Sequence, residues 1–447
     1  MSAILIKNGR VVDPVTGIDK IMDVLIRDGV VDGMGYNLEL EFEELDLGLD
    51  DMPKEEKPKE DLEVIDATGL VVAPGLMDAH VHFRDPGFTE KEDMETGAKA
   101  ALKGGFTRVV CMANTKPCVD NLETLEYIKG KAKDLPIKLM QTATITKGLK
   151  GEELTDMQEM LSAGACGFTD DGIPIMDEKV LLEAMKNAKR LKCPLSLHEE
   201  DPLFIEEAGV HMGEVSEKLE YGGASRTAED IMVARDCMMA LNTGAKVCIQ
   251  HISSGNSVEM VRLAKKLGAN VYAEATPHHF TLTDEAVLEY GTYARMNPPL
   301  RTEDDRLKII EGIKDGTINM IVTDHAPHTT EEKAKPLSSA PSGIIGLETS
   351  LALGIKSLVQ PGHISLLQLL SLMSKNPAQF YQIKPASISY GEAADIVIFG
   401  ENEEWKVDKF ASKASNSPFV GWTLPGKVHY TLVNGEIKYN SSEDKEA

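Results

Sequence analysis

The chain has 447 residues, 42% of them hydrophobic and 27% charged, which suits a large globular core with a smaller second module. Its formal net charge is −25, from 72 acidic and 47 basic residues. So acidic a surface repels nucleic acid and anionic membranes, and we expect neither as a partner. The absence of a basic leader, of a long apolar run and of paired cysteine spacing predicts a cytoplasmic protein.

Short apolar strands are predicted at both ends of the chain, at residues 4–6, 11–12, 24–26, 395–399 and 428–433. The dipeptides Asn8-Gly9, Asp28-Gly29 and Asn434-Gly435 predict tight turns beside them. We expect residues 1–70 and 389–447 to form one small β-sandwich domain. Within the first part, residues 39–61 are rich in Glu, Asp and Lys, which predicts an acidic, mobile insert.

Between residues 71 and 388, apolar strand-like segments alternate with helix-like ones, a pattern typical of βαβ units. Eight strand candidates end at His82, Ala113, Thr146, Asp171, His198, Ser253, Thr276 and Asp324. Helical patterns cover residues 121–133, 152–163, 177–191, 227–242, 256–267 and 304–314, with a last helix after Gly346. Eight such units predict a (β/α)₈ TIM barrel of the α/β class, whose site lies at the carboxyl ends of its strands.

Side chains that can bind a metal gather at these predicted strand ends: His80, His82, Asp171, His198, His251 and Asp324. Residues i and i+2 of a strand point the same way, so both His80 and His82 are predicted to face the barrel axis. Each residue alone could be a hydrogen-bonded core residue. Six of them converging on one mouth predict a metal centre, and imidazole and carboxylate suit zinc, with manganese or cobalt as substitutes.

At this point the chain resembles the class I dihydroorotases of the amidohydrolase superfamily. Nine motifs come in the family's order and cover almost the whole chain. They are DAHVHFRDPG (78–87), MANT (112–115), FTDDG (168–172), HEED (198–201), QHISS (250–254), TPHHF (276–280), MNPPLR (296–301), TDHAPH (323–328) and PSGIIGLET (341–349).

The resemblance implies a centre of two zinc ions per subunit. His80, His82 and Asp324 would bind one ion, His198 and His251 the other, with Asp171 and a hydroxide as bridges. Many relatives, such as hydantoinases, bridge with a carbamylated lysine on the fourth strand, where this chain has Asp170 and Asp171 and no lysine. The family pattern favours the second acid, and the sequence leaves Asp170 open.

The implied catalytic residue is Asp324. It would accept a proton from the attacking water and deliver it to the leaving amide nitrogen, the work of a general base that then acts as an acid. Zinc would supply the rest of the chemistry, since it lowers the pKa of bound water to about 7 and polarises a carbonyl.

The resemblance also implies residues that hold the substrate. Arg84 suits a two-pronged grip on a carboxylate; its structural alternative is an ion pair with Asp85 or another acid. Asn114 would donate to the same carboxylate and Asn297 to the ring. His328 would face the substrate, or else be satisfied by backbone. Residues 341–343 would offer backbone groups to the ring, namely Pro341, Ser342 and Gly343.

The function implied is that of a dihydroorotase, an enzyme that interconverts N-carbamoyl-L-aspartate and (S)-dihydroorotate in pyrimidine biosynthesis. One alternative is another cyclic amidase, such as a hydantoinase or an allantoinase. A second is an inactive relative that scaffolds aspartate transcarbamoylase, although all six ligand residues are present. We expect a small-molecule substrate and a homodimer, and leave open an active complex with aspartate transcarbamoylase.

Overall fold

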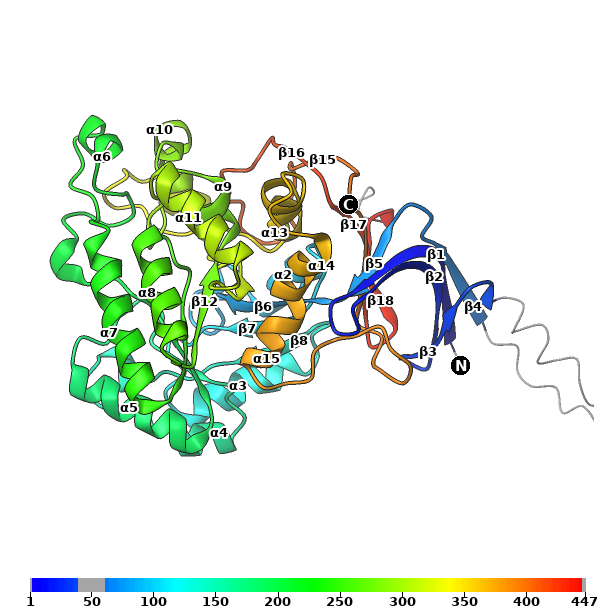
Figure 1. The fold of residues 1–447 in the computed structure, drawn as a ribbon, viewed down its shortest axis with the longest axis horizontal. Helices are drawn as coiled ribbons and strands as arrows, with labels where there is room; N and C mark the ends of the chain where they lie inside the picture. Colours follow the sequence, from blue (N-terminus) through cyan, green and yellow to red (C-terminus); the bar gives the residue numbers. More distant parts are fainter. Residues whose placement is uncertain (1, 39–60, 444–447) are drawn as a thin grey trace, which may run out of the picture.

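The protein is described by a computed structural model of residues 2–38 and 61–443. The predicted acidic insert at 39–61 lies outside the described residues, apart from Asp61, which begins a strand. Figure 1 shows a large body of strands and helices with a sheet beside it, near which both ends of the chain lie.

The strands near the two ends pair in one sheet, as the sequence predicts. Its order is β18-β17-β14-β5-β1-β2-β3, with β4 parallel to β1. The strands are β1 (Ser2–Asp13), β2 (Ile18–Arg27), β3 (Val30–Gly35), β4 (Asp61–Asp66), β5 (Val71–Pro74), β14 (Ile396–Gly400), β17 (Lys427–Val433) and β18 (Glu436–Asn440). Because β5 pairs with β1 and β14, residues 71–74 belong to this sheet, and the barrel strands begin after them.

Two of the three predicted turns are found. Asp28-Gly29 joins β2 to β3, and Asn434-Gly435 joins β17 to β18. The turn predicted at Asn8-Gly9 is wrong, because β1 continues through it with a bulge. Asn8 takes a left-handed φ of 59° there, and a Cβ on Gly9 would lie 2.4 Å from Cγ2 of Val72.

Eight parallel strands form the predicted barrel. They are β6 (Leu76–Val81), β7 (Phe106–Cys111), β8 (Lys138–Gln141), β9 (Phe168–Thr169), β10 (Pro194–Leu197), β11 (Lys246–Ile249), β12 (Val271–Ala275) and β13 (Met320–Ile321). They pair as two arcs, β6-β7-β8 and β9 to β13. Bridges from Ala143 to Phe168 and from Val81 to His325 join the arcs, so the barrel is closed.

Helices follow the strands around the barrel. The longer ones are α2 (Met94–Lys103), α3 (Leu122–Ala132), α4 (Met157–Ser162), α5 (Glu178–Leu191), α7 (Thr227–Thr243), α8 (Gly255–Lys266) and α11 (Glu303–Lys314). The shorter ones are α6 (Glu214–Lys218), α9 (Pro277–Thr281), α10 (Ala286–Tyr290), α12 (Thr330–Lys333), α13 (Ser350–Gly354), α14 (Leu366–Leu370) and α15 (Asn376–Phe380). Single turns occur at Lys147–Leu149, Pro202–Phe204, Gly291–Ala294, Ile355–Val359 and Ser371–Lys375, and β15 (Trp405–Lys406) pairs with β16 (Thr423–Leu424). Among the described residues no helix is long and apolar enough to cross a membrane.

Two predicted strand ends are wrong, at Thr146 and Ser253, because β8 and β11 end several residues earlier. The backbone amides beyond those strands donate to buried carboxylates in place of a neighbouring strand. The amide of Thr146 donates to Asp170 over 3.1 Å, and that of Ser253 to Glu229 over 3.1 Å. Side chains therefore shape the barrel mouth where backbone pairing stops.

Candidate metal centre

The six predicted ligand residues all lie at the carboxyl ends of barrel strands. His80 is on β6 and His82 follows it, while the other four come just after β9, β10, β11 and β13. Each of the six is at most 8% exposed. Parallel strands bring their carboxyl ends to one face of a barrel, which is why residues nearly 250 positions apart meet here.

Asp171 lies between the two groups of histidines. Its Oδ1 is 3.3 Å from Nε2 of His80, 3.7 Å from Nε2 of His251 and 3.9 Å from Nδ1 of His198. Its Oδ2 is 3.4 Å from Nε2 of His82. One carboxylate thus faces all four imidazoles, the position that a bridging ligand would need.

Asp324 contacts the two histidines of the first group, as Asp171 does. Its Oδ1 lies 3.0 Å from Nε2 of His82 and 3.5 Å from Nε2 of His80. In the second group, Nδ1 of His198 and Nε2 of His251 are 3.1 Å apart. Possible ligand atoms form two sets, and within each set all the atoms lie within 4.8 Å of one another. One set belongs to His80, His82 and Asp324, and the other to His80, Asp171 and His251.

The backbone is unusual at three residues of the mouth. Arg84, His251 and Asp324 have φ values of 59°, 27° and 47°, in or near the left-handed region that residues with a Cβ rarely adopt. Such conformations cost on the order of 1–3 kcal/mol each and gather at functional sites. Here they occur where the chain leaves a strand, and they accompany side chains that face the metal centre.

Polar partners orient the histidines from outside the cluster. Nδ1 of His82 lies 3.0 Å from Oδ1 of Asn114, and Nε2 of His198 lies 3.0 Å from Glu200. Nδ1 of His80 lies 3.3 Å from Glu274 and 3.4 Å from Nε2 of Gln250. Contacts of this kind fix which ring nitrogen is left to bind a metal.

Sequence reasoning missed three of these partners, although signals for them exist. Gln250 and Glu200 lie in the QHISS and HEED motifs beside predicted ligands. Glu274 is the one acid in the apolar strand β12 and is fully buried. A buried acid inside a barrel strand requires a partner, and that requirement could have identified it.

Charge at the centre favours ionised carboxylates. Burial raises the pKa of Asp171, yet the charges and hydrogen bonds of His80, His251 and His82 outweigh it and hold this pKa well below its usual value. The pKa of Asp324 is lowered in the same way, by His82, His80 and His251 against burial. Both side chains are therefore anionic and able to bind a cation at neutral pH.

Asp170 and Asp171 occupy different environments. Asp170 accepts hydrogen bonds from the amides of Ile145 over 2.7 Å and Thr146 over 3.1 Å, and from the hydroxyl of Thr146. Burial raises its pKa to about 6 in spite of these bonds. Asp170 thus holds the loop after β8, whereas its neighbour faces the histidines.

The residues present fit a metal. Four imidazoles and two carboxylates offer only nitrogen and oxygen atoms, which suits zinc, manganese or cobalt. Nε2 of His80 is buried, makes no hydrogen bond among the described residues, and lies beside both carboxylates. A buried nitrogen without a hydrogen bond is costly unless something else, such as a cation, contacts it.

The predicted substrate residue Arg84 lies close to this centre. Its Nε donates to the carbonyl of Pro327 over 3.3 Å, and no carboxylate of the described residues lies within 4.0 Å of it. The alternative partner, Asp85, is bound instead to Lys131 over 2.8 Å and to Tyr127 over 3.0 Å. The structural reading of Arg84 as an ion pair is therefore wrong.

The contacts of Asn114 differ from its predicted role as a donor to the substrate carboxylate. Its Nδ2 donates to Oδ2 of Asp171 over 3.0 Å and to the Asp171 carbonyl over 3.3 Å. Its Oδ1 is the atom that faces His82. In this structure the amide of Asn114 therefore contacts two predicted ligands, His82 and Asp171.

The remaining predicted substrate residues meet in a cluster of loops. The hydroxyl of Ser342 donates to Oδ1 of Asn297 over 3.0 Å. The backbone carbonyl of Ser342 lies 2.8 Å from Nε2 of His328. His328 is buried, which, with the charge of Arg84, lowers its pKa to about 3. A neutral His328 donates from Nε2 to that carbonyl, so backbone satisfies at least one of its nitrogens.

Of His278, His279 and His325, the last two have hydrogen-bonding partners. His278 and His279 are on α9 rather than on a continuing strand, because β12 ends at Ala275. Nε2 of His279 lies 3.0 Å from the carbonyl of Pro298. His325 contacts Glu92 over 3.4 Å and accepts from the amide of Gly346 over 3.2 Å.

Comparison with known proteins adds to this geometry. A family model described as Dihydro-orotase-like matches residues 69–257. The chain is 57% identical to a dihydroorotase of Clostridioides difficile over 98% of its own length and 100% of that protein. It is 51% identical to a dihydroorotase of Clostridium acetobutylicum over 99% and 100% of the two chains. The chain belongs to the dihydroorotase family.

Membership of this family makes the chain an enzyme, a cyclic amide hydrolase that depends on a metal cofactor. Solved structures show the same fold. An L-hydantoinase from Arthrobacter aurescens aligns with a TM-score of 0.83 at 24% identity, over 98% of this chain and 96% of that one. A D-hydantoinase from Thermus sp. aligns with a TM-score of 0.81 at 23% identity, over 98% and 95%. These neighbours confirm the barrel with its added β domain.

Proposed function

We propose that this enzyme interconverts N-carbamoyl-L-aspartate and (S)-dihydroorotate in pyrimidine biosynthesis, and that it does so with two zinc ions. The observation that supports this best is the position of Arg84, a cation that no carboxylate of the described residues contacts, beside the cluster of ligands. Dihydroorotate is a cyclic amide that carries a carboxylate, so its recognition needs both features.

The proposed centre divides the six ligand residues between two ions. His80, His82 and Asp324 hold the first, and His198 and His251 hold the second. Asp171 faces both groups of histidines and would be the residue that the two ions share. Zinc bound there would activate water and polarise the amide carbonyl of the substrate.

Asp324 moves the proton in the proposed reaction. Its Oδ1 faces His82 and His80, while its Oδ2 accepts no hydrogen bond from the described residues. In the ring-opening direction, water adds to the ring carbonyl carbon and gives a proton to this carboxylate. The carbon–nitrogen bond then breaks, and the same carboxylate returns the proton to the leaving nitrogen. Ring closure is the reverse.

The other side of the mouth holds the substrate in this proposal. Arg84 grips the carboxylate, and Asn114 holds the ligands His82 and Asp171 through its two amide atoms. Asn297, His328 and residues 341–343 surround the ring. The chain as a whole carries a charge of −25, so a local cation must hold an anionic substrate.

One assay tests the proposal. The purified enzyme, loaded with zinc, is offered dihydroorotate, dihydrouracil, hydantoin and allantoin in parallel. We expect dihydroorotate to be opened far faster than the other three, which lack its ring carboxylate. Equal or faster opening of hydantoin or dihydrouracil would replace this proposal with a hydantoinase-type activity. The homodimer and the complex with aspartate transcarbamoylase stay predictions, which sedimentation of the enzyme with and without the transcarbamoylase tests.

A further inference from the structure

The loop that carries Pro341, Ser342 and Gly343 is held by an unusually complete set of polar contacts. Arg295 donates to the carbonyl of Ala340 and, over 3.2 Å, to the hydroxyl of Ser342. The amide of Gly343 donates to the carbonyl of Arg295 over 2.9 Å. Residues 341–343 are in no strand, and side-chain donors together with this backbone hydrogen bond hold them in place.

Lys333 is the most unusual of them. It ends α12, is 1% exposed, and its Nζ donates to the carbonyls of Pro341 over 2.9 Å and Gly343 over 3.0 Å. No carboxylate of the described residues lies within 4.0 Å of it. Burial, with the nearby charge of Arg295, lowers its pKa to about 7. A fully buried lysine without a counter-ion is rare, because an ammonium group is costly to remove from water.

Asn416 holds the same loop from the other end of the chain. Its Nδ2 donates to the carbonyls of Gly343 and Ala326, each over 3.0 Å, and its Oδ1 accepts from the amide of His328 over 3.1 Å. It is 2% exposed. One amide therefore joins the loop after β13, which carries His328, to the loop that carries Gly343.

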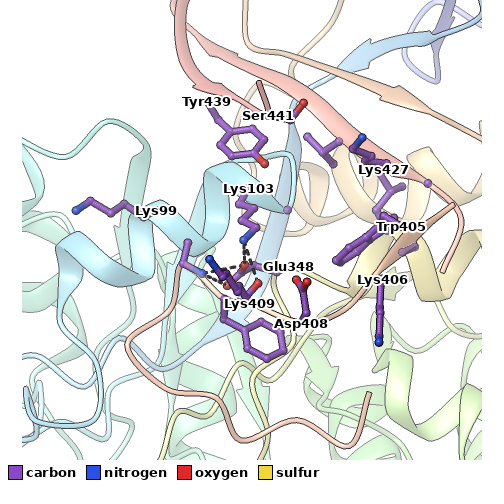
Figure 2. Close-up of a pocket in the computed structure, with 17 residues that line it drawn as sticks. Lys99, Lys103, Glu348, Trp405, Lys406, Asp408, Lys409, Lys427, Tyr439 and Ser441 are labelled. Carbon is purple, nitrogen blue, oxygen red and sulfur yellow. Dashed lines mark hydrogen bonds and ion pairs between the residues drawn. The ribbon is translucent and has the colours of Figure 1, made fainter. Parts of the chain in front are cut away.

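The segment leading to Asn416 is itself anchored to the barrel. Glu348 accepts hydrogen bonds from the amides of Ala411 and Ser412, over 3.0 and 3.1 Å, and lies 3.3 Å from Nζ of Lys103 on α2. Figure 2 shows Glu348 and Lys103 in contact at the centre of the pocket that this segment borders. Asn416 thus reaches the active site from a fixed support.

We propose that Lys333 and Asn416 are positioning residues that hold the backbone of residues 341–343 against the substrate ring. This inference rests on the proposed function, because it takes that loop as part of the substrate site. Neither residue contacts a proposed metal ligand or the reacting atoms. Their work is to fix the carbonyls of the loop, so their loss affects substrate binding before it affects chemistry.

The test uses Lys333→Met, which keeps the bulk of the side chain and removes its donors. Met removes the donor to the carbonyls of Pro341 and Gly343, but it also removes the cost of burying an ammonium group, so we expect a Tm close to that of the wild type and an unchanged metal content. Losing the two hydrogen bonds that fix the loop should raise KM for dihydroorotate about tenfold, with kcat changed by less than about threefold.

Lys246→Met is the matched control. Lys246 also buries part of its length and donates to two backbone carbonyls, of Gln379 over 2.9 Å and Phe380 over 2.6 Å, but at the start of β11, on the opposite face of the barrel. We expect its KM to stay at the wild-type value. An equal rise in KM for both variants, or none in Lys333→Met with folding intact, overturns the proposal.

Asn416→Asp decides the matter if Lys333→Met does not fold. It keeps the acceptor for the amide of His328 and removes the donor to Gly343, so KM should again rise about tenfold or more while metal content stays constant. A KM equal to that of the wild type contradicts the proposal. If the wild-type enzyme itself does not open dihydroorotate, the proposed function fails instead, and the variants are compared on the ring it does open.

Discussion

The two halves of the barrel mouth are built in different ways. On one half, strands place His80, His82, His198, His251 and the two aspartates within a few ångströms of one another. On the other half, loops place Asn297, His328 and residues 341–343, and side chains such as Lys333 and Asn416 tie these loops together. The first half takes its geometry from backbone pairing and the second from buried polar contacts. The proposed chemistry therefore depends on strand pairing, and the proposed substrate fit depends on contacts between loops.

The largest effect is expected from Asp171→Ala, at the centre of the strand-built half. The variant should lose its metal and nearly all activity, because one carboxylate faces all four histidines. Metal content and turnover of dihydroorotate are measured side by side. Activity near the wild-type level with both metals bound would contradict the bridging role.

Asp170→Ala is the control for that substitution. Its buried carboxylate satisfies the amides of Ile145 and Thr146, so its loss should cost about 1–3 kcal/mol of stability and leave the metals in place.

A carboxylate bridge at Asp171 also needs no CO₂, unlike a carbamylated lysine. After the metal is removed with a chelator, zinc in CO₂-free buffer should restore activity. Recovery only when bicarbonate is added would contradict a carboxylate bridge.

Asp324→Asn tests the proton transfer proposed for the same half. It should lose less metal than Asp171→Ala does. The amide keeps an oxygen near His82 and His80 but cannot accept a proton from water. We expect a fall in kcat of about 10² to 10⁴-fold, the range typical of general acid–base catalysis. Turnover close to wild type in a metal-loaded variant would refute the role as proton carrier.

The contrast between the halves also explains what could be predicted from the sequence. Strand periodicity and the position of each ligand at a strand end predicted the barrel and the meeting of His80, Asp171 and Asp324. The sequence leaves Asp170 and Asp171 open, and only the structure shows that Asp170 accepts hydrogen bonds from the backbone of residues 145 and 146 while Asp171 faces the histidines.

The loop-built half was predicted mainly by resemblance. No periodic pattern places Ser342 beside Asn297, or Lys333 and Asn416 around Gly343, since contacts between loops depend on tertiary packing alone. The turn predicted at Asn8-Gly9 fails for a related reason. The dipeptide allows a left-handed backbone, which serves a bulge as well as a hairpin, and packing against Val72 selects the bulge.

Arg84→Ala tests whether this residue holds the carboxylate of the substrate. A charge-assisted pair contributes roughly 1.5 to 3 kcal/mol, so kcat/KM for dihydroorotate should fall about tenfold to a hundredfold with both metals retained. Arg84→Lys should recover only part, because a point charge lacks the planar fork of the guanidinium. Dihydrouracil, which lacks the carboxylate, should react poorly with wild type and barely respond. Unchanged opening of dihydroorotate by Arg84→Ala would show that another group holds the carboxylate.

The smallest effect is expected from the acidic segment 39–60. The strands that flank it, β3 and β4, belong to the terminal sheet, where β3 pairs with β2 and β4 with β1, and Figure 1 shows this sheet beside the barrel. Replacing residues 39–60 with a shorter Gly-Ser linker removes no described contact of the mouth. Each halving of a loop lowers the cost of closing it by only about 0.6 kcal/mol, so stability should rise slightly if it changes at all. We expect kcat/KM within about twofold of wild type, because neither the metal ligands nor the substrate loops depend on that edge of the sheet. A tenfold loss of activity in a variant with an unchanged Tm would mean that the segment contacts the active site or a required subunit.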